Sequence, residues 1–132
     1  MIHLKTFAAA AVALLVLAMP ATAQSDKPSE VGFGVFTFTS GPAAAYGMPG
    51  RNAAELVIEQ INAAGGIGGV KIKPTYVDEG QGTEGVVAEF RRLAADQNNQ
   101  VMVAALSSGN CLALAPVADQ LAVAATDVVG EC

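Results

Sequence analysis

Two neighbouring serines, Ser107 and Ser108, carry the hydroxyl groups that are best placed for chemistry in this sequence. They follow the apolar run 101–106 and open a helical pattern, so they stand at a predicted strand-to-helix turn. The free N–H groups and the dipole at a helix start favour an anion, and two hydroxyl groups there could hold a carboxylate. A simpler interpretation is that a serine only caps the helix, since Ser is a preferred N-cap residue. These residues alone leave both interpretations open.

Patterns that would indicate catalysis or a cofactor are incomplete. The one histidine, His3, lies within the first 23 residues, which are described below as a signal peptide. The two serines therefore have no imidazole base in the rest of the chain. Asp78 and Glu79 are adjacent at a predicted strand end, where neighbouring side chains tend to point apart, so a solvated loop or a helix cap is expected rather than acid–base chemistry. Two cysteines without a histidine make a poor metal site. The sequence therefore predicts no enzyme, no cofactor and no metal.

The glycine-rich run 65–69 invites comparison with a phosphate-binding loop. Such loops follow a strand and open a helix, whereas this run follows a helical pattern and leads into a strand. It is therefore predicted to be a helix C-cap and a turn.

The first 23 residues are typical of a secretory signal peptide. Lys5 supplies the early positive charge, an apolar run follows, and Ala21 and Ala23 give the small-x-small cleavage pattern. Cleavage would leave Gln24 as the mature N-terminus and place the protein in the periplasm. The formal net charge of −5 opposes binding to a phosphate backbone, so nucleic acid is not an expected partner.

Alternating strand and helix patterns predict an α/β fold with a doubly wound parallel sheet. Strands are expected at 31–38, 70–77, 101–106 and 122–129, and helices around 54–61 and at 83–97 and 110–121. In the common strand order 2-1-3-4, the first and third strands are neighbours at the topological switch point. The loop 39–46 would then face Ser107 and Ser108 across one crevice. The chain stops directly after a buried-type strand, so we expect it to be the front portion of a longer protein.

The two cysteines are expected to form a disulfide, because an exported chain meets an oxidising compartment. Cys111 opens the helix after the third strand and Cys132 ends the loop after the fourth, so both would lie at the same end of the sheet.

Several segments together resemble periplasmic binding proteins of the branched-chain amino acid ABC transporter type, which have the type I periplasmic binding fold. The similarity follows the order of the chain, and its most specific part is the Ile-Asn-x-x-Gly-Gly-Ile-x-Gly element at 61–69. The other segments that carry it are 38–47, 53–56, Asp78, 106–109 and 115–118.

The resemblance implies a two-lobed protein that clamps a small solute between its lobes and delivers it to an inner-membrane ABC transporter permease. Residues 24–132 would form the N-terminal segment of the first ligand-binding lobe, which is incomplete here, and the second lobe would lie outside this chain. Ser108 would bind the ligand carboxylate, and Tyr46 would lie near the ligand side chain. Ser107, Gly109 and Asn110 complete the candidate set through a hydroxyl and backbone N–H groups.

The ligand itself stays open between an amino acid, an amide and an aromatic acid. Glu131 stands where amino acid binders of this type usually offer small and hydroxyl residues, and it would repel a carboxylate if it pointed inward. An extracytoplasmic sensory domain that uses the same fold is the alternative function, since fold does not fix function.

Overall fold

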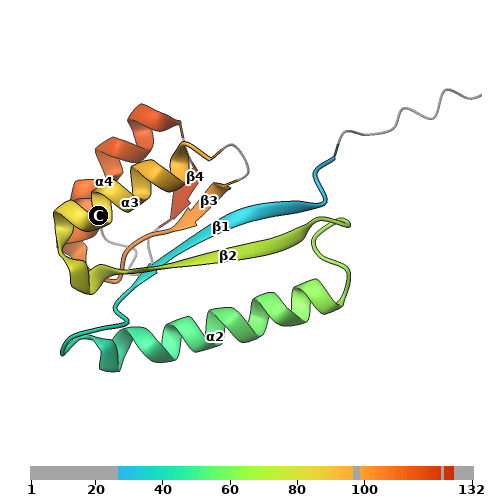
Figure 1. The fold of residues 1–132 in the computed structure, drawn as a ribbon, viewed down its shortest axis with the longest axis horizontal. Coiled ribbons are helices and arrows are strands. Elements are labelled where there is room, and N and C mark those ends of the chain that lie inside the picture. The colour runs from blue at the N-terminus through green and yellow to red at the C-terminus, as the bar shows by residue number, and fades with distance from the viewer. Residues whose placement is uncertain (1–26, 97–98, 123, 127–132) are drawn as a thin grey trace, which may run out of the picture.

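The computed structural model describes residues 27–96, 99–122 and 124–126, and the predicted signal peptide, Glu131 and Cys132 lie outside them. The described part is a parallel sheet with helices on both faces, which confirms the predicted α/β class (Figure 1). The elements in chain order are β1 (Glu30–Thr37), α2 (Ala44–Ala63), β2 (Lys71–Asp78), the 3-10 helix η1 (Glu79–Gln81), α3 (Thr83–Ala94), β3 (Asn99–Val103), α4 (Ser108–Leu121) and β4 (Ala124–Thr126).

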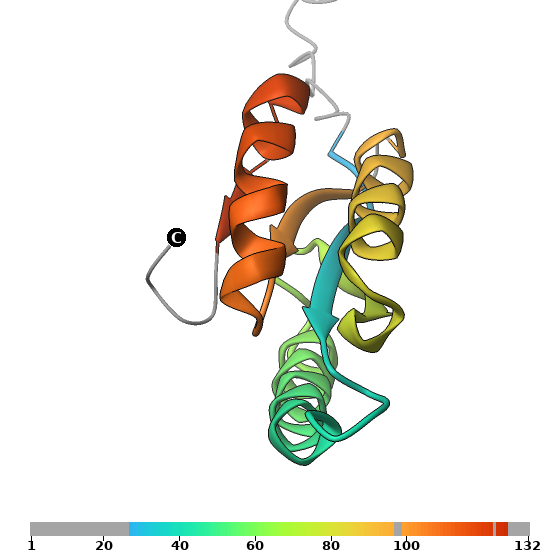
Figure 2. The ribbon, with the colours of Figure 1, turned by 90° about the vertical axis from the view of Figure 1, so that its left-hand side faces the viewer.

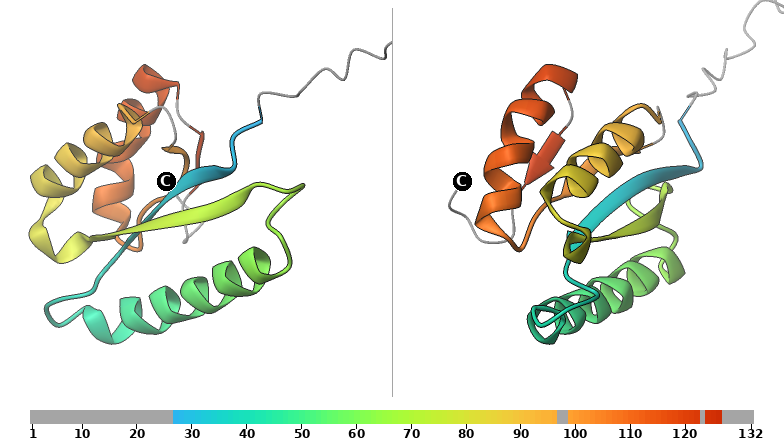
Figure 3. Two further views of the ribbon diagram at one scale, coloured as in Figure 1. Left: turned by 45° about the vertical axis from the view of Figure 1, so that its right-hand side comes forward. Right: turned by 60° about the vertical axis from the view of Figure 1, so that its left-hand side comes forward.

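The strand order is β2-β1-β3-β4, as predicted. All neighbouring strands are parallel, and β1 pairs with β2 along its whole length, from Glu30 opposite Lys71 to Thr37 opposite Asp78. Helix α2 lies on one face of the sheet, whereas α3 and α4 lie side by side on the other face (Figure 2). Because the strands are parallel, the turns after β1, β2 and β3 meet at one end of the sheet, which Figure 3 shows from two further sides.

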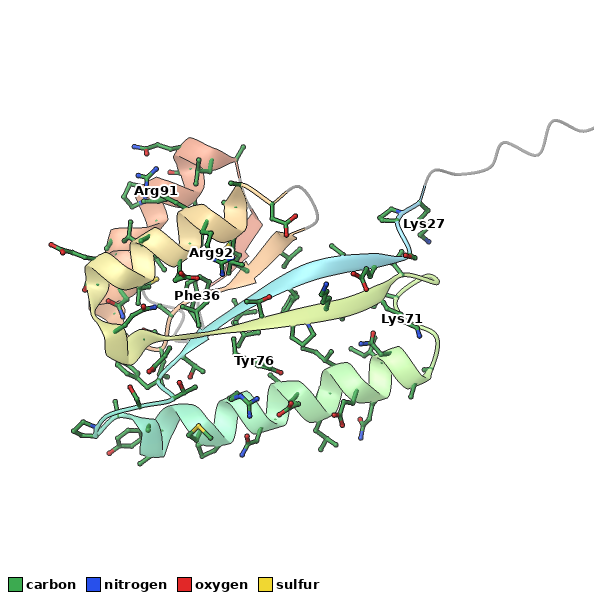
Figure 4. The ribbon with its side chains drawn as sticks, viewed as in Figure 1. Lys27, Phe36, Lys71, Tyr76, Arg91 and Arg92 are labelled. Atoms are coloured by element: carbon green, nitrogen blue, oxygen red, sulfur yellow. The ribbon has the colours of Figure 1, made fainter. Side chains whose placement is uncertain are left out.

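The core lies between the sheet and the pair α3 and α4. Helix α3 buries Val86, Phe90 and Leu93, whose spacing places them on one helical face. Phe36 on β1 and Phe90 are both fully buried, and their ring centroids are 5.7 Å apart. Figure 4 shows Phe36 on the side of the sheet that α3 covers. Met102 on β3 is also fully buried, so the core joins the two central strands to the helices above them.

Helix α2 begins earlier than the sequence pattern predicted. Its apolar spacing indicated a helix around 54–61 after a loop that reached Tyr46, but the helix begins at Ala44 and runs through Pro49. Gly47 explains the difference, because its missing side chain lets the first turns of α2 lie directly on Phe38: a Cβ atom there would stand 2.1 Å from the carbonyl oxygen of Phe38. Tyr46 therefore lies in the first turn of a helix and not in a loop.

The first two strands lie within one residue of their predicted bounds, whereas the third and fourth differ more. The third strand was expected to reach Leu106 but ends at Val103, because Ala105 has a φ of 135° that breaks the extended ladder. Ala122 was expected to begin the fourth strand, yet it ends α4 in the left-handed conformation, with a φ of 52°. The fourth strand is described only from Ala124 to Thr126, and residues 127–129 lie outside the described residues.

The glycine run after α2 forms the predicted helix end and turn. Gly65 and Gly66 have φ angles of 98° and 83°, and the N–H of Gly66 donates to the carbonyl of Ile61 at 2.9 Å. This 6→1 bond is the usual closure of a helix by left-handed residues. Ile67 and Val70 then exchange backbone bonds of 2.8 and 3.1 Å, which turns the chain into β2. Within the described ranges, none of the helices is both long and apolar enough to cross a membrane.

Candidate functional site

The candidate site is the turn between β3 and the start of α4. Ser107 is the N-cap of α4: its hydroxyl oxygen accepts a hydrogen bond from the N–H of Asn110 at 3.4 Å, and its carbonyl accepts from the N–H of Cys111 at 2.9 Å. The cap interpretation thus applies to Ser107. Ser108 is the first helical residue, and its side chain is exposed. Among the residues that the structure describes, its hydroxyl group has no hydrogen-bond partner, so it is available to a ligand.

The next two residues differ from each other. Gly109 is exposed, and a Cβ atom at this position would have only Ser107 Oγ within 4 Å, at 3.7 Å, so the helix start is open there. Asn110 is buried and its polar groups are already in use. Its backbone N–H donates to the Ser107 hydroxyl that caps the helix. Its Nδ2 donates to Glu79 Oε2 at 2.9 Å, and its Oδ1 accepts from Thr83 Oγ1 at 2.8 Å. A direct bond from the Asn110 N–H to a ligand, as the sequence suggested, would have to displace the cap.

Glu79 is the residue that sequence reasoning misjudged. A solvated loop or a cap was expected for the adjacent carboxylates, but the Glu79 side chain is only 2 % exposed. Its Oε1 accepts from the N–H of Leu106 at 2.5 Å, and its Oε2 accepts from the N–H of Ser107 at 3.0 Å as well as from Asn110. Burial of a carboxylate is tolerated when such donors replace water. These partners lie 27 to 31 positions away in the chain, so no local pattern indicated them.

Asp78 binds a different segment from Glu79, because its carboxylate accepts hydrogen bonds from the turn after β1. It caps η1 by accepting from the N–H of Gly80 at 2.9 Å, which agrees with the helix-cap expectation. Its Oδ1 also accepts from the N–H groups of Thr39 at 2.8 Å and Ser40 at 3.2 Å. The Ser40 hydroxyl and then these backbone N–H groups lower the pKa of Asp78 well below the ordinary range of a carboxyl group, against an opposing effect of burial.

We expect Asp78 to make stability depend on acid pH. Its folded-state pKa is depressed, so its contribution is fully present above the unfolded value of about 4 and is lost as the pH falls below that value. Asp78→Asn should lower the free energy of unfolding by about 1 kcal/mol at pH 7, because a neutral acceptor forms weaker bonds than a charged one. The difference from wild type should shrink between pH 5 and pH 2 in urea unfolding. Glu59→Gln, which changes an exposed carboxylate on α2, is the control; a pH-independent difference for Asp78→Asn would contradict the assignment.

Tyr46 and the cysteines complete the predicted set. The Tyr46 side chain is 78 % exposed on the first turn of α2, and no hydrogen bond joins it to the serines within the described residues. Cys111 is buried against the core, but Cys132 lies outside the described residues, so the Cys111–Cys132 disulfide stays a prediction. No group of three or more side chains able to hold a metal ion occurs in the described ranges.

Comparison with known proteins assigns the class that this fold and site define. The family model for periplasmic binding proteins matches residues 30–131, so the chain belongs to the periplasmic binding protein family. A Leu/Ile/Val-binding protein homolog 7 of Brucella abortus (strain 2308) is 32 % identical over 111 residues, which are 82 % of this chain and 27 % of that protein. The homologous protein of Brucella suis biovar 1 is 34 % identical over 110 residues, or 81 % of this chain and 25 % of its own length.

Solved structures agree with this family and fold. The branched-chain amino acid transporter substrate-binding protein LivJ from Streptococcus pneumoniae, in complex with isoleucine, is 29 % identical with a TM-score of 0.65 and covers 76 % of this chain and 28 % of its own. An extracellular ligand-binding receptor from Rhodopseudomonas palustris is 27 % identical with a TM-score of 0.65, over 76 % of this chain and 26 % of that one. The present chain thus spans about a quarter of the length of the proteins it matches.

Proposed function

We propose that this chain supplies part of the solute site of a periplasmic binding protein that serves an ABC transporter. The solute is a small amino acid or a related carboxylate or amide, and the chain reaches the periplasm through cleavage after Ala23. Family membership, the named binding roles of its relatives and the signal-peptide pattern support this proposal. The Streptococcus pneumoniae relative holds isoleucine, so branched-chain amino acids are the first solutes to test.

The observation that carries the proposal is the exposed Ser108 hydroxyl group at the start of α4. Because Ser107 caps α4, the exposed hydroxyl of Ser108 is left at the positive end of a helix of 14 residues. The exposed Gly109 beside it lets a ligand approach the backbone closely. A hydroxyl group and helix N–H groups together suit a carboxylate. Tyr46 is exposed in the first turn of α2, which follows β1, the strand next to β3 in the sheet. We propose that it contacts the solute side chain.

Ser108→Ala is expected to weaken carboxylate binding about ten- to a hundredfold, because a hydrogen bond to a charged group is worth roughly 1.5 to 3 kcal/mol. The melting temperature should hardly change, since the cap is formed by Ser107. Amide NMR titration of the chain with L-leucine and L-isoleucine measures the affinity even where a partial site binds in the millimolar range. L-leucinamide, which lacks the carboxylate, should bind wild type and variant alike.

Gln120→Ala provides the matched control, because Gln120 is an exposed residue on the same helix, far from its start, and accepts only a long, exposed hydrogen bond of 3.4 Å from Arg91. It should leave both affinity and melting temperature unchanged. Equal affinities of wild type and Ser108→Ala for L-leucine would remove the carboxylate anchor from the proposal. If no amino acid, amide or aromatic acid gives saturable shifts, whether the chain is titrated alone or together with the rest of the binding protein, the proposed function is overturned.

A further inference from the structure

The turn before Ser108 contains a strained residue. Ala105 is fully buried and has a φ of 135°, which L residues with a side chain rarely adopt. Such a conformation persists only where the surrounding structure enforces it, and it is concentrated at functional sites. Something must therefore hold the backbone on either side of Ala105.

Glu79 provides that restraint. Its two carboxylate oxygens accept from the N–H groups of Leu106 and Ser107, the two residues that directly follow Ala105. Because β3 ends at Val103, neither N–H group belongs to the described strand pairing of β3. The Asn110 amide adds a third donor to Glu79 from within α4. One buried side chain, from the first residue of η1, thus fixes both the strained turn and the first turn of α4.

The same contacts decide which donors remain for a ligand. The N–H of Ser107 is taken by Glu79 and that of Asn110 by the cap. Within the described residues, the hydroxyl and N–H groups of Ser108 and the N–H group of Gly109 are left without a partner outside the helix. Glu79 and the Ser107 cap together therefore leave Ser108 and Gly109 as the donors that this helix start offers to an anion.

We propose that Glu79 is a positioning residue of the solute site, which sets the place and direction of Ser108 without touching the ligand. This inference rests on the proposed function, because it assigns Glu79 a role in the affinity of that site. Thr83 supports the arrangement through its bond to the Asn110 amide oxygen, so the restraint extends from β2 across the start of α3 to α4. A residue that only stabilised the fold would change the melting temperature and leave the affinity intact.

Glu79→Gln tests the proposal with little change of shape. Glutamine has one acceptor oxygen, and its NH₂ group would face an N–H donor, so one of the two backbone bonds must be lost. In the ligand-free chain, hydrogen exchange of the Leu106 and Ser107 amides should accelerate at least about tenfold. Affinity for L-leucine, measured by the same NMR titration, should fall about tenfold as Ser108 loses its position.

Ile58→Val is the matched control for a general loss of stability. Ile58 is buried on α2, on the face of the sheet opposite to α3 and α4, and lies outside the core cluster that contains Ala105. The variant should lower the melting temperature and keep the affinity of wild type for L-leucine. If Glu79→Gln does not fold, the double variant Ala105→Gly with Glu79→Gln replaces it, because glycine relieves the strained φ. That variant should fold and still bind L-leucine about tenfold more weakly than Ala105→Gly alone.

The outcomes separate the two proposals. If Glu79→Gln binds L-leucine with the same affinity as wild type, the positioning role is overturned and the proposed function stays intact. Tighter binding by Glu79→Gln also overturns it, since it would mean that Glu79 acts on the ligand by charge repulsion. If the wild-type sequence binds none of these solutes, either alone or together with the rest of the binding protein, the proposed function is overturned, and the positioning role with it.

Discussion

Phe90→Ala is expected to lower the free energy of unfolding by about 3 to 5 kcal/mol, the range for removing a buried aromatic ring from a packed core. Phe90 is fully buried, and its ring lies 5.7 Å from that of Phe36 at a tilt of 45°, so the substitution removes both buried area and an aromatic pair. A single domain has only about 5 to 15 kcal/mol of stability, so this loss would remove a large share of it. Urea unfolding followed by circular dichroism measures the effect.

Phe90→Leu serves as the control for this prediction, because it keeps an apolar side chain of similar reach. It should lower the free energy of unfolding by less than the alanine variant, since less volume is left empty. A loss below 1 kcal/mol for Phe90→Ala would contradict the position of this ring at the centre of the core.

Gly47→Ala is expected to have the second largest effect, a loss of about 3 kcal/mol of stability. The added Cβ atom would stand 2.1 Å from the carbonyl oxygen of Phe38 and 2.7 Å from its nitrogen, both of them backbone atoms that cannot rotate away. The first turns of α2 would have to move off the end of β1. Because Tyr46 precedes Gly47, its amide NMR signal should shift strongly, and urea unfolding measures the stability.

The same helix offers a control of opposite sign. A Cβ atom at Gly50 would meet nothing within 4 Å, so Gly50→Ala should only exchange a poor helix former for a good one. It should raise the free energy of unfolding by about 0.5 to 1 kcal/mol. If both variants had the same sign, close packing of α2 on Phe38 could not be the reason for glycine at position 47.

The site was only partly predictable, for a reason that particular residues show. Ser107 and Ser108 were found at a helix start, because the change from an apolar strand to a helical pattern is local in the sequence. Which serine caps the helix depends on φ and ψ at the turn, and the N–H of Asn110 selects Ser107. Asn110 itself was expected at the ligand, whereas its amide joins Glu79 to Thr83 inside the protein.

The sequence by itself determined the class of fold and the family. Strands alternating with amphipathic helices dictate a parallel sheet, and the glycine turn after α2 follows from backbone conformations that only glycine adopts easily. These features are periodic or local, so neighbouring residues suffice to indicate them. Tertiary structure alone decided that Asp78 and Glu79 serve different turns, one after β1 and one after β3. A carboxylate takes its donors from whatever segment folding brings to it, and for Glu79 those donors come from across the switch point of the sheet.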